Sequence, residues 1–245
     1  MRYGSLIICA TPRSGTTLLC DLLAETGVTG TPNSFYRAES VANFARQLDV
    51  ADGPDFEWRY LDAIIAEGRG STDLFSMRVM WPSVKTMRDA LAPLFPKETT
   101  DSGRIAAAFG APLYLFVERR DKVGQAISRI KAEQSGLWHR AADGSVREQG
   151  GDYREPEYDA VSIRASIAET TAHEANWRHW FVREGIAPLT QTYEELSVDP
   201  VGTIRALLAA LGREPSAADR IVAQTSKLAD ATSRDWAERY ARDAV

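Results

Sequence analysis

Residues 7–19 read "IICATPRSGTTLL", and this stretch decides the fold. A short apolar run leads into residues 12–17, "PRSGTT", and a leucine-rich segment follows at once. A strand that enters a tight loop and then a helix presents unpaired backbone N–H groups at the start of that helix, where an anion can bind. The stretch therefore predicts an α/β protein with a phosphate-binding loop at residues 10–17.

The loop differs from the one that binds ATP or GTP, which reads G-x-x-x-x-G-K-[ST]. An overlay places Ala10 at the first glycine, Gly15 at the second and Thr16 at the lysine. That lysine reaches the β- and γ-phosphates, so its absence argues against a nucleoside triphosphate. We expect a ligand with one phosphate in the loop.

Arg13 is the residue that we expect to supply the missing positive charge, because a planar guanidinium suits a phosphate or a sulfonate. The neighbouring donors are Ser14, Gly15, Thr16 and Thr17. The alternative is a structural strand–helix turn with a surface arginine.

A second anion site is predicted within residues 112–131, "PLYLFVERRDKVGQAISRIK". An apolar strand ends near Arg119 and Arg120, and Asp121 is a suitable N-cap for the next helix. Ligands of open α/β sheets bind beyond the carboxyl ends of the strands, so this strand end and the first loop share one rim. Arg120 and Ser128 could hold a phosphate together, although an Arg-Arg pair can also be simply solvated. Two anion sites on one rim suggest a nucleotide with a phosphate at each end.

The rest of the chain alternates in the same way. Apolar runs at residues 6–9, 74–80, 112–117 and 186–190 predict strands. Helical patterns cover residues 16–25, 56–66, 121–134, 162–184 and 201–211. This order predicts a three-layer P-loop-type α/β fold with a central parallel sheet flanked by helices. We expect one domain over residues 1–245, with a mobile polar loop at about 141–157.

Composition excludes several classes of protein. The chain has 245 residues, 44% of them hydrophobic, and a net charge of −5, which argues against a general nucleic-acid binder. No apolar run reaches the roughly 18 residues of a membrane span, and "LIICA" is too short for a signal peptide. Cys9 and Cys20 are expected to be buried thiols. Neither the cysteines nor the three histidines have metal-ligand spacing, so we expect a cytoplasmic enzyme without a metal site.

The two anion motifs together resemble the sulfotransferases that use 3′-phosphoadenosine 5′-phosphosulfate (PAPS). Their 5′ loop reads P-[KR]-[ST]-G-[ST]-[ST], and their 3′ signature is an arginine at a strand end with a serine eight residues later, as in Arg120 and Ser128. The segment "TYEELSVDP", residues 192–200, is similar to a Tyr-Glu-Asp segment whose tyrosine lies near the adenine, which implies that role for Tyr193. The resemblance implies PAPS as donor and adenosine 3′,5′-bisphosphate as product.

The sequence resembles one bacterial branch more closely, the Stf0 (trehalose 2-sulfotransferase) and NodH-like family. The matching segments are "TGVTGTPNSFYR" at 26–37, "DKVGQAISRIKAEQSGLWH" at 121–139 and "KLADATSRDWAERY" at 227–240. The resemblance covers almost the whole chain. It implies a carbohydrate or glycolipid acceptor, metal-independent in-line transfer and a homodimer.

Two positions depart from that family. The glutamate proposed there as general base precedes a Phe-Phe pair, and here the position is Ser34, followed by Phe35 and Tyr36. The glutamine before the loop arginine is replaced by Pro12. Both changes fall where the acceptor is expected, so they argue against trehalose and leave the base unassigned.

Arg78 is the second arginine that we expect to act on the sulfuryl group. It interrupts the apolar run "LFSMRVMWP", where a charge costs several kcal/mol unless it is paired or lies at a strand end. Many sulfotransferases have Lys-x-His-x-Pro here, which places Met80 at the histidine. The alternative is an arginine paired structurally with an acid.

Glu39 is the candidate base, against the alternative of an acid at a helix N-terminus. The expected acceptor-binding residues are Asn33, Ser34, Phe35, Arg37 and Trp81, whereas Trp177 and Trp180 are expected in the core. Two other functions stay open. One is a small-molecule kinase with a P-loop, and the other is a PAPS-binding protein with impaired catalysis.

Overall fold

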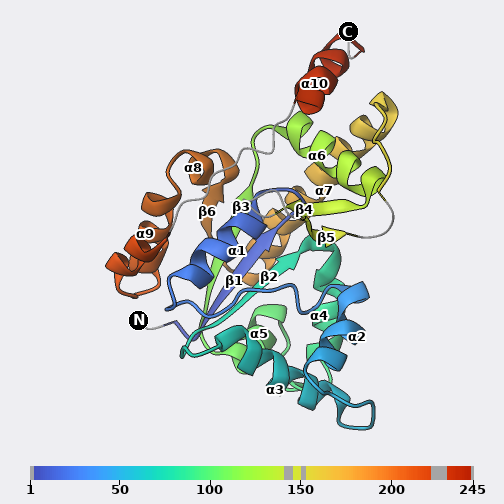
Figure 1. Ribbon diagram of the computed structural model, residues 1–245. Helices are drawn as coiled ribbons and strands as arrows, with labels where there is room; N and C mark the ends of the chain where they lie inside the picture. Colours follow the sequence, from blue (N-terminus) through green and yellow to red (C-terminus); the bar gives the residue numbers. More distant parts are fainter. Residues whose placement is uncertain (1–2, 141–145, 150–152, 222–230, 244–245) are drawn as a thin grey trace.

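The computed structural model describes residues 3–140, 146–149, 153–221 and 231–243. At its centre lies a parallel sheet of four strands in the order β2-β1-β3-β6, with helices on both faces (Figure 1). The strands are β1 (Ser5–Ala10), β2 (Phe75–Met80), β3 (Pro112–Glu118) and β6 (Leu189–Thr192). The predicted fold class, a central parallel sheet flanked by helices, is confirmed.

Ten α-helices are described, and their order follows the chain. They are α1 (Thr16–Glu25), α2 (Ala38–Gln47), α3 (Phe56–Arg69), α4 (Val84–Leu91), α5 (Asp101–Phe109), α6 (Lys122–Ser135), α7 (Ala160–Glu184), α8 (Tyr193–Val198), α9 (Pro200–Ala210) and α10 (Ala231–Asp243). Two 3₁₀ turns, η1 (Trp81–Ser83) and η2 (Pro215–Arg220), follow β2 and α9.

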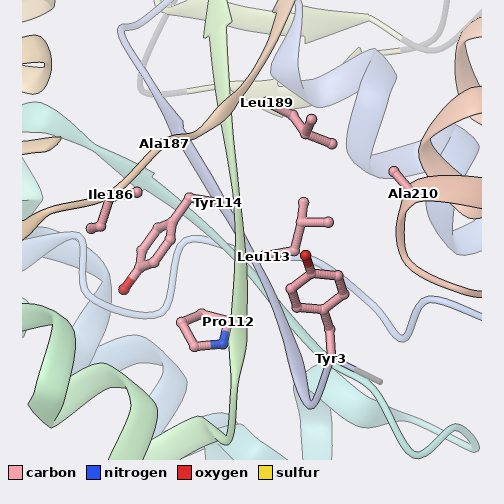
Figure 2. Close-up of a pocket in the computed structure, with 8 residues that line it drawn as sticks. All are labelled: Tyr3, Pro112, Leu113, Tyr114, Ile186, Ala187, Leu189 and Ala210. Atoms are coloured by element: carbon pink, nitrogen blue, oxygen red, sulfur yellow. The ribbon is translucent and has the colours of Figure 1, made fainter. Parts of the chain in front are cut away.

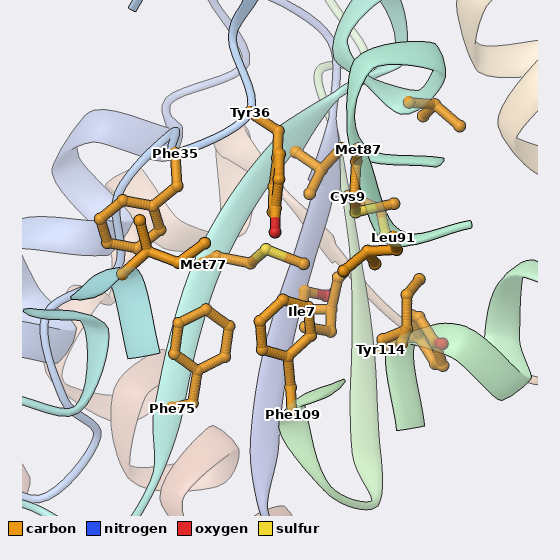
Figure 3. Close-up of a cluster of buried hydrophobic side chains, with 14 of the residues drawn as sticks. Ile7, Cys9, Phe35, Tyr36, Phe75, Met77, Met87, Leu91, Phe109 and Tyr114 are labelled. Carbon is orange, nitrogen blue, oxygen red and sulfur yellow. Dashed lines mark hydrogen bonds between the residues drawn. The ribbon is translucent and has the colours of Figure 1, made fainter. Parts of the chain in front are cut away.

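Alternate residues of the central strands build two separate cores, because successive side chains of a strand point to opposite faces. Ile7 and Cys9 of β1 pack with buried residues of α3, α4, α5 and α7. Figure 3 shows this cluster, including Phe75, Met77 and Phe109. Leu6 and Ile8 of the same strand pack against α1, α8 and α9 on the other face. The absence of polar alternation in these strands is thus explained by burial on both sides.

Helix boundaries agree closely with the sequence pattern where a cap is present. Helix α1 has the predicted bounds. The Asp121 side chain accepts from the N–H of Gly124 at the start of α6, and the Asp199 side chain accepts from that of Gly202 at the start of α9. Each carboxylate satisfies an N–H that has no partner inside its helix. Helix α7 ends at Gly185, which has a φ of 66°.

Three predicted boundaries are wrong. Helix α3 continues to Arg69 rather than ending at residue 66. Strand β6 begins at Leu189, later than predicted, because Pro188 has no N–H to give to a ladder. The polar stretch expected as a loop contains β5 (Val146–Gln149), which pairs antiparallel with β4 (Leu137–Arg140). Its residues 141–145 and 150–152 lie outside the described residues, so its mobility stays a prediction.

Other expectations concern buried side chains. Cys9 and Cys20 are free and buried, and Trp177 and Trp180 are buried in the core, as predicted.

No helix within the described ranges has the length and apolar character to cross a membrane. Among those same residues, no three His, Cys, Asp or Glu side chains form a group that could hold a metal ion.

Candidate active site

The loop between β1 and α1 has the backbone of an anion-binding turn. Arg13 and Gly15 both have left-handed φ values, 63° and 82°, and the hydroxyl of Ser14 donates to the carbonyl of Thr11 at 2.8 Å. Left-handed residues in a tight turn direct successive N–H groups to one side, and the first N–H groups of α1 add to them. The loop therefore has the backbone geometry of an anion-binding turn, and phosphate binding by it stays a prediction.

Two side chains, one on α6 and one on α7, form hydrogen bonds with the first residues of this loop. The Gln125 amide donates to the Thr11 hydroxyl at 3.0 Å and to the Pro12 carbonyl at 2.7 Å. The Trp177 indole donates to the Ala10 carbonyl at 2.9 Å. All these bonds end on the loop or on the last residue of β1. Sequence reasoning assigned Gln125 no role. In the structure its buried side-chain amide, on α6, supports the loop.

Arg13 joins the two anion sites that the sequence predicted separately. Its Nε donates to the Ser128 hydroxyl on α6 at 3.0 Å, and its Nη1 donates to the Trp138 carbonyl at 2.7 Å. The loop and the first turns of α6 therefore form one site, with the Arg13 guanidinium between them.

Among the described residues, the hydrogen bonds of the Arg78 guanidinium all go to neutral hydroxyl groups. Its Nε donates to Ser34 Oγ at 2.8 Å, and its Nη1 donates to the hydroxyls of Thr17 and Thr16 at 3.1 and 3.5 Å. No ion pair joins Arg78 to an acidic side chain in the part of the chain that the structure describes, so the alternative of a structural ion pair does not describe it here. A guanidinium that bonds to neutral partners keeps its full charge for an anionic ligand.

The segment before α2 reaches Arg78 because it runs beside β2. Asn33 forms an isolated parallel bridge with Met77, and the Asn33 carbonyl accepts from the Arg78 N–H at 2.9 Å. The Ser34 N–H donates to the Asn33 side chain at 2.8 Å. Ser34 is thereby held beside Arg78, whose guanidinium also donates to Thr17 on α1.

Phe35 was predicted to bind the acceptor, and this prediction is wrong. Its side chain is fully buried, with its ring centroid 5.2 Å from that of Phe44 and 6.1 Å from that of Phe75. The ring fills the space between α2 and β2 and so offers no face to a ligand. Trp81 is partly buried and packs edge-to-face on Trp177, with the centroids 5.1 Å apart.

Glu39 was predicted as the general base, but its partner among the described residues is Arg37 and not Arg78 or Ser34. It lies in the first turn of α2, 75% of its side chain is exposed, and it pairs with Arg37 at 3.2 Å. A carboxylate in this position is stabilised by the helix dipole. The alternative reading, an acid at a helix N-terminus, describes Glu39 as the structure has it.

Arg119 and Arg120 follow β3 directly, and their side chains have different partners. The Arg119 guanidinium lies 4.6 Å above the centroid of the Tyr193 ring, and its Nη1 donates to the Arg13 carbonyl at 3.5 Å. Arg120 is 65% exposed and pairs with Glu195 at 2.6 Å. The arginine that contacts the loop in this structure is thus Arg119, which sequence reasoning placed on the rim without a role.

Glu194 joins this strand end to α8. Its carboxylate accepts from the N–H groups of Arg120 and Asp121, at 3.1 Å each. Burial alone would raise the pKa of Glu194, but these two N–H groups and the nearby charge of Arg119 outweigh burial and lower the pKa below its ordinary value of 4.5.

Substitution Glu194→Gln is expected to lower the free energy of unfolding near pH 7 by about 1–2 kcal/mol, because the glutamine carbonyl can still accept but the hydrogen bonds lose their charge assistance. A depressed pKa stabilises the fold above the ordinary value, and this contribution is lost as the pH falls through the folded pKa. The gap between parent and variant should therefore shrink as the pH falls below 4.5. Urea unfolding at several pH values measures it, and a constant gap would contradict the assignment.

A cavity of about 340 Å³ lies elsewhere in the molecule (Figure 2). It is lined by Tyr3, Pro112, Leu113, Tyr114, Ile186, Ala187, Leu189 and Ala210. Because β3 begins at Pro112, this cavity lies at the amino end of that strand, whereas the loop follows the carboxyl end of β1. The cavity is therefore separate from the candidate site.

Comparisons with known proteins identify the family of this chain. The chain is 29% identical to the trehalose 2-sulfotransferase of Mycolicibacterium smegmatis, over 97% of this chain and 94% of that protein. It is 27% identical to the trehalose 2-sulfotransferase of Mycobacterium tuberculosis, with the same coverage. A crystal structure of a sulfotransferase from Alicyclobacillus acidocaldarius aligns with a TM-score of 0.44 and 14% identity, covering 99% of this chain and 93% of that one. The family model for Stf0 sulfotransferases matches residues 5–243, and the chain is therefore a sulfotransferase of the Stf0 family.

Proposed function

We propose that the enzyme transfers a sulfuryl group from PAPS to a hydroxyl group of a carbohydrate or glycolipid. The observation that carries this proposal is the position of Arg78, bonded to Ser34, Thr16 and Thr17 and to no carboxylate among the described residues. It leaves a second fixed positive charge beside a loop that already contains Arg13. Such a site suits a phosphate extended by a sulfonate.

The residues of the rim divide between the two ends of the donor in this proposal. The N–H groups of residues 14–17 and Arg13 would hold the 5′-phosphate, and Arg120 with Ser128 would hold the 3′-phosphate. Tyr193, whose ring contacts Gly15 and Arg119, would lie near the adenine. Arg120 would exchange its present partner Glu195 for the phosphate.

Transfer breaks the S–O bond to the 5′-phosphate and forms an S–O bond to the acceptor oxygen. Negative charge develops on the phosphate oxygen that leaves, and the acceptor hydroxyl releases its proton. Donors that are fixed before the reaction lower this barrier most, because they need no reorganisation. Arg13 and Arg78 fit this role, since hydroxyl and carbonyl partners hold both guanidinium groups.

The acceptor is placed on the Ser34 side of Arg78 in this proposal. Asn33 and Ser34 provide polar groups there, and Arg37 and Trp81 lie in the segments next to them. The two related trehalose 2-sulfotransferases support a carbohydrate acceptor. Ser34 replaces the family's glutamate, so we expect trehalose to be a poor acceptor. The homodimer stays a prediction.

Transfer of label from PAPS to a panel of disaccharides, lipo-oligosaccharides and glycolipids, with trehalose included, tests the function. We expect at least one labelled sugar product. Calorimetry without magnesium should show binding of adenosine 3′,5′-bisphosphate. Magnesium-dependent binding of ATP would favour a kinase instead, and nucleotide binding without transfer to any acceptor would favour a binding protein.

Substitution Arg120→Ala is expected to lower the affinity for adenosine 3′,5′-bisphosphate by about 10–100-fold, the effect of losing a charged hydrogen-bond donor. Adenosine 5′-monophosphate lacks the 3′-phosphate, so its affinity should change little. Calorimetry on both nucleotides measures the difference. Equal losses for the two would refute the assignment of Arg120 to the 3′-phosphate.

A further inference from the structure

Arg119 and Tyr193 form a contact that reaches the middle of the loop. A Cβ added to Gly15 would lie 2.4 Å from Tyr193 Cδ2, 3.2 Å from Cε2 and 3.4 Å from Cγ. These distances belong to an approach at the edge of the ring, in its plane. The Arg119 guanidinium lies over a face of the same ring, 4.6 Å from the centroid. Gly15 therefore contacts the edge of the Tyr193 ring and Arg119 contacts its face, so the ring makes both contacts in a single orientation.

Arg119 also contacts the loop directly, through the carbonyl of Arg13. This carbonyl belongs to a residue with a left-handed φ of 63°. Such a conformation is costly for a residue with a side chain, and it persists where neighbouring groups hold it. Arg119 thus acts on both left-handed residues of the loop: on Arg13 by a direct hydrogen bond, and on Gly15 through the Tyr193 ring.

The backbone that carries Arg119 is held on both sides. Lys122 Nζ donates to the Arg119 carbonyl and to the buried carboxylate of Glu174. The Glu194 carboxylate accepts from the next two N–H groups, those of Arg120 and Asp121. Arg119 itself is only 16% exposed and pairs with Asp121 at 3.4 Å. A side chain fixed in this way can hold a second element in place.

We propose that Arg119 is a positioning residue for sulfuryl transfer. It fixes the Tyr193 ring against Gly15, and through that ring and the Arg13 carbonyl it keeps the loop in its anion-binding conformation before the donor arrives. Its role in nucleotide affinity rests on the proposed function, whereas its effect on the loop does not. Arg120, the neighbour expected to hold the 3′-phosphate, faces solvent and has a different task.

Hydrogen exchange of the ligand-free protein tests this role, with millisecond labelling and peptides that cover residues 11–18. Substitution Arg119→Met should speed exchange there by about fivefold, the size of one cation–π contact. Tyr193→Leu removes the ring contact but keeps the hydrogen bond from Arg119 to the Arg13 carbonyl, so it should speed exchange by up to the same factor, and the double variant should be no faster than Arg119→Met. Tyr193→Phe should behave like the parent, because the contacts with Gly15 and Arg119 use the ring.

Arg178→Met is the matched control, since the Arg178 guanidinium lies 5.5 Å from the centroid of the Phe116 ring and pairs with Glu118, and no hydrogen bond or ion pair joins it to the loop among the described residues. It should leave exchange at residues 11–18 unchanged. Parent-like exchange in Arg119→Met, or additive effects in the double variant, would overturn the proposal. Calorimetry with adenosine 3′,5′-bisphosphate should show a similar fivefold loss for Arg119→Met. Absence of binding by the parent would refute the proposed function while the exchange result still decides the role of Arg119.

Discussion

Substitution Arg78→Met is expected to lower kcat for sulfuryl transfer by about 10²–10³-fold, the usual loss when one fixed donor to a developing charge is removed. The side chain spans from Ser34 to the hydroxyls of Thr16 and Thr17, so its charge lies between the segment expected to face the acceptor and the loop expected to hold the donor. Affinity for adenosine 3′,5′-bisphosphate, which lacks the sulfonate, should change far less. Steady-state kinetics and calorimetry separate the two quantities.

Two further variants make this expectation specific. Arg78→Lys keeps the charge but cannot donate to two directions from a planar fork, so it should recover only part of the rate. Arg88→Met removes an arginine that pairs with Asp89 on the surface of α4, and it should match the parent. An Arg78→Met enzyme with an unchanged kcat, or with equal losses in kcat and in affinity for the bisphosphate, would show that Arg78 does not act selectively on the transferred group.

Most of the fold could be predicted because its strands are apolar throughout and are separated by capped helices. Strands β1 and β3 were placed within a residue or two, and Asp121 and Asp199 mark the helix starts. Helix α8 also has a readable signal, since Thr192 and Glu195 form a capping box. The hairpin of β4 and β5 could not be predicted in the same way, because its pairing stabilises strands of polar composition.

The site was predictable where it is built from one continuous segment. The loop and the spacing between Arg120 and Ser128 are local patterns. The contact between Ser34 and Arg78 joins residues 44 apart, and it depends on the single bridge between Asn33 and Met77. Phe35 follows Ser34 directly, and only the packing of α2 against β2 directs its ring into the core. Residue type alone does not separate these two positions.

The neighbouring arginines show the same limit at the strand end. Arg119 and Arg120 have equal chemistry, and spacing to Ser128 favours Arg120. The structure turns Arg119 towards Tyr193 and the loop, and turns Arg120 towards Glu195. Which residue points inward follows from how the backbone leaves β3, where Lys122 and Glu194 hold it. A side chain can therefore belong to the site without having a motif of its own.

Substitution Gly15→Ala is expected to weaken binding of adenosine 3′,5′-bisphosphate by about 30-fold or more, because backbone strain and a steric clash each cost about 1–3 kcal/mol. Gly15 has a φ of 82°, and the added methyl group would lie 2.4 Å from Tyr193 Cδ2. Either the loop or the ring must move, and both belong to the proposed nucleotide site. Circular dichroism should show a folded protein, because the clash lies at the rim and outside both cores.

A matched glycine and a double variant separate the two causes. Gly185 has a φ of 66°, but nothing lies within 4 Å of an added Cβ. Gly185→Ala should therefore show only the strain, about 1–2 kcal/mol of stability, with normal nucleotide binding. Arg13 already adopts a φ of 63° in this loop, so strain alone is tolerable there. The clash should then dominate at Gly15, and combining Gly15→Ala with Tyr193→Leu should recover part of the affinity. Failure of the double variant to bind better than Gly15→Ala would mean that the loop needs the glycine backbone itself.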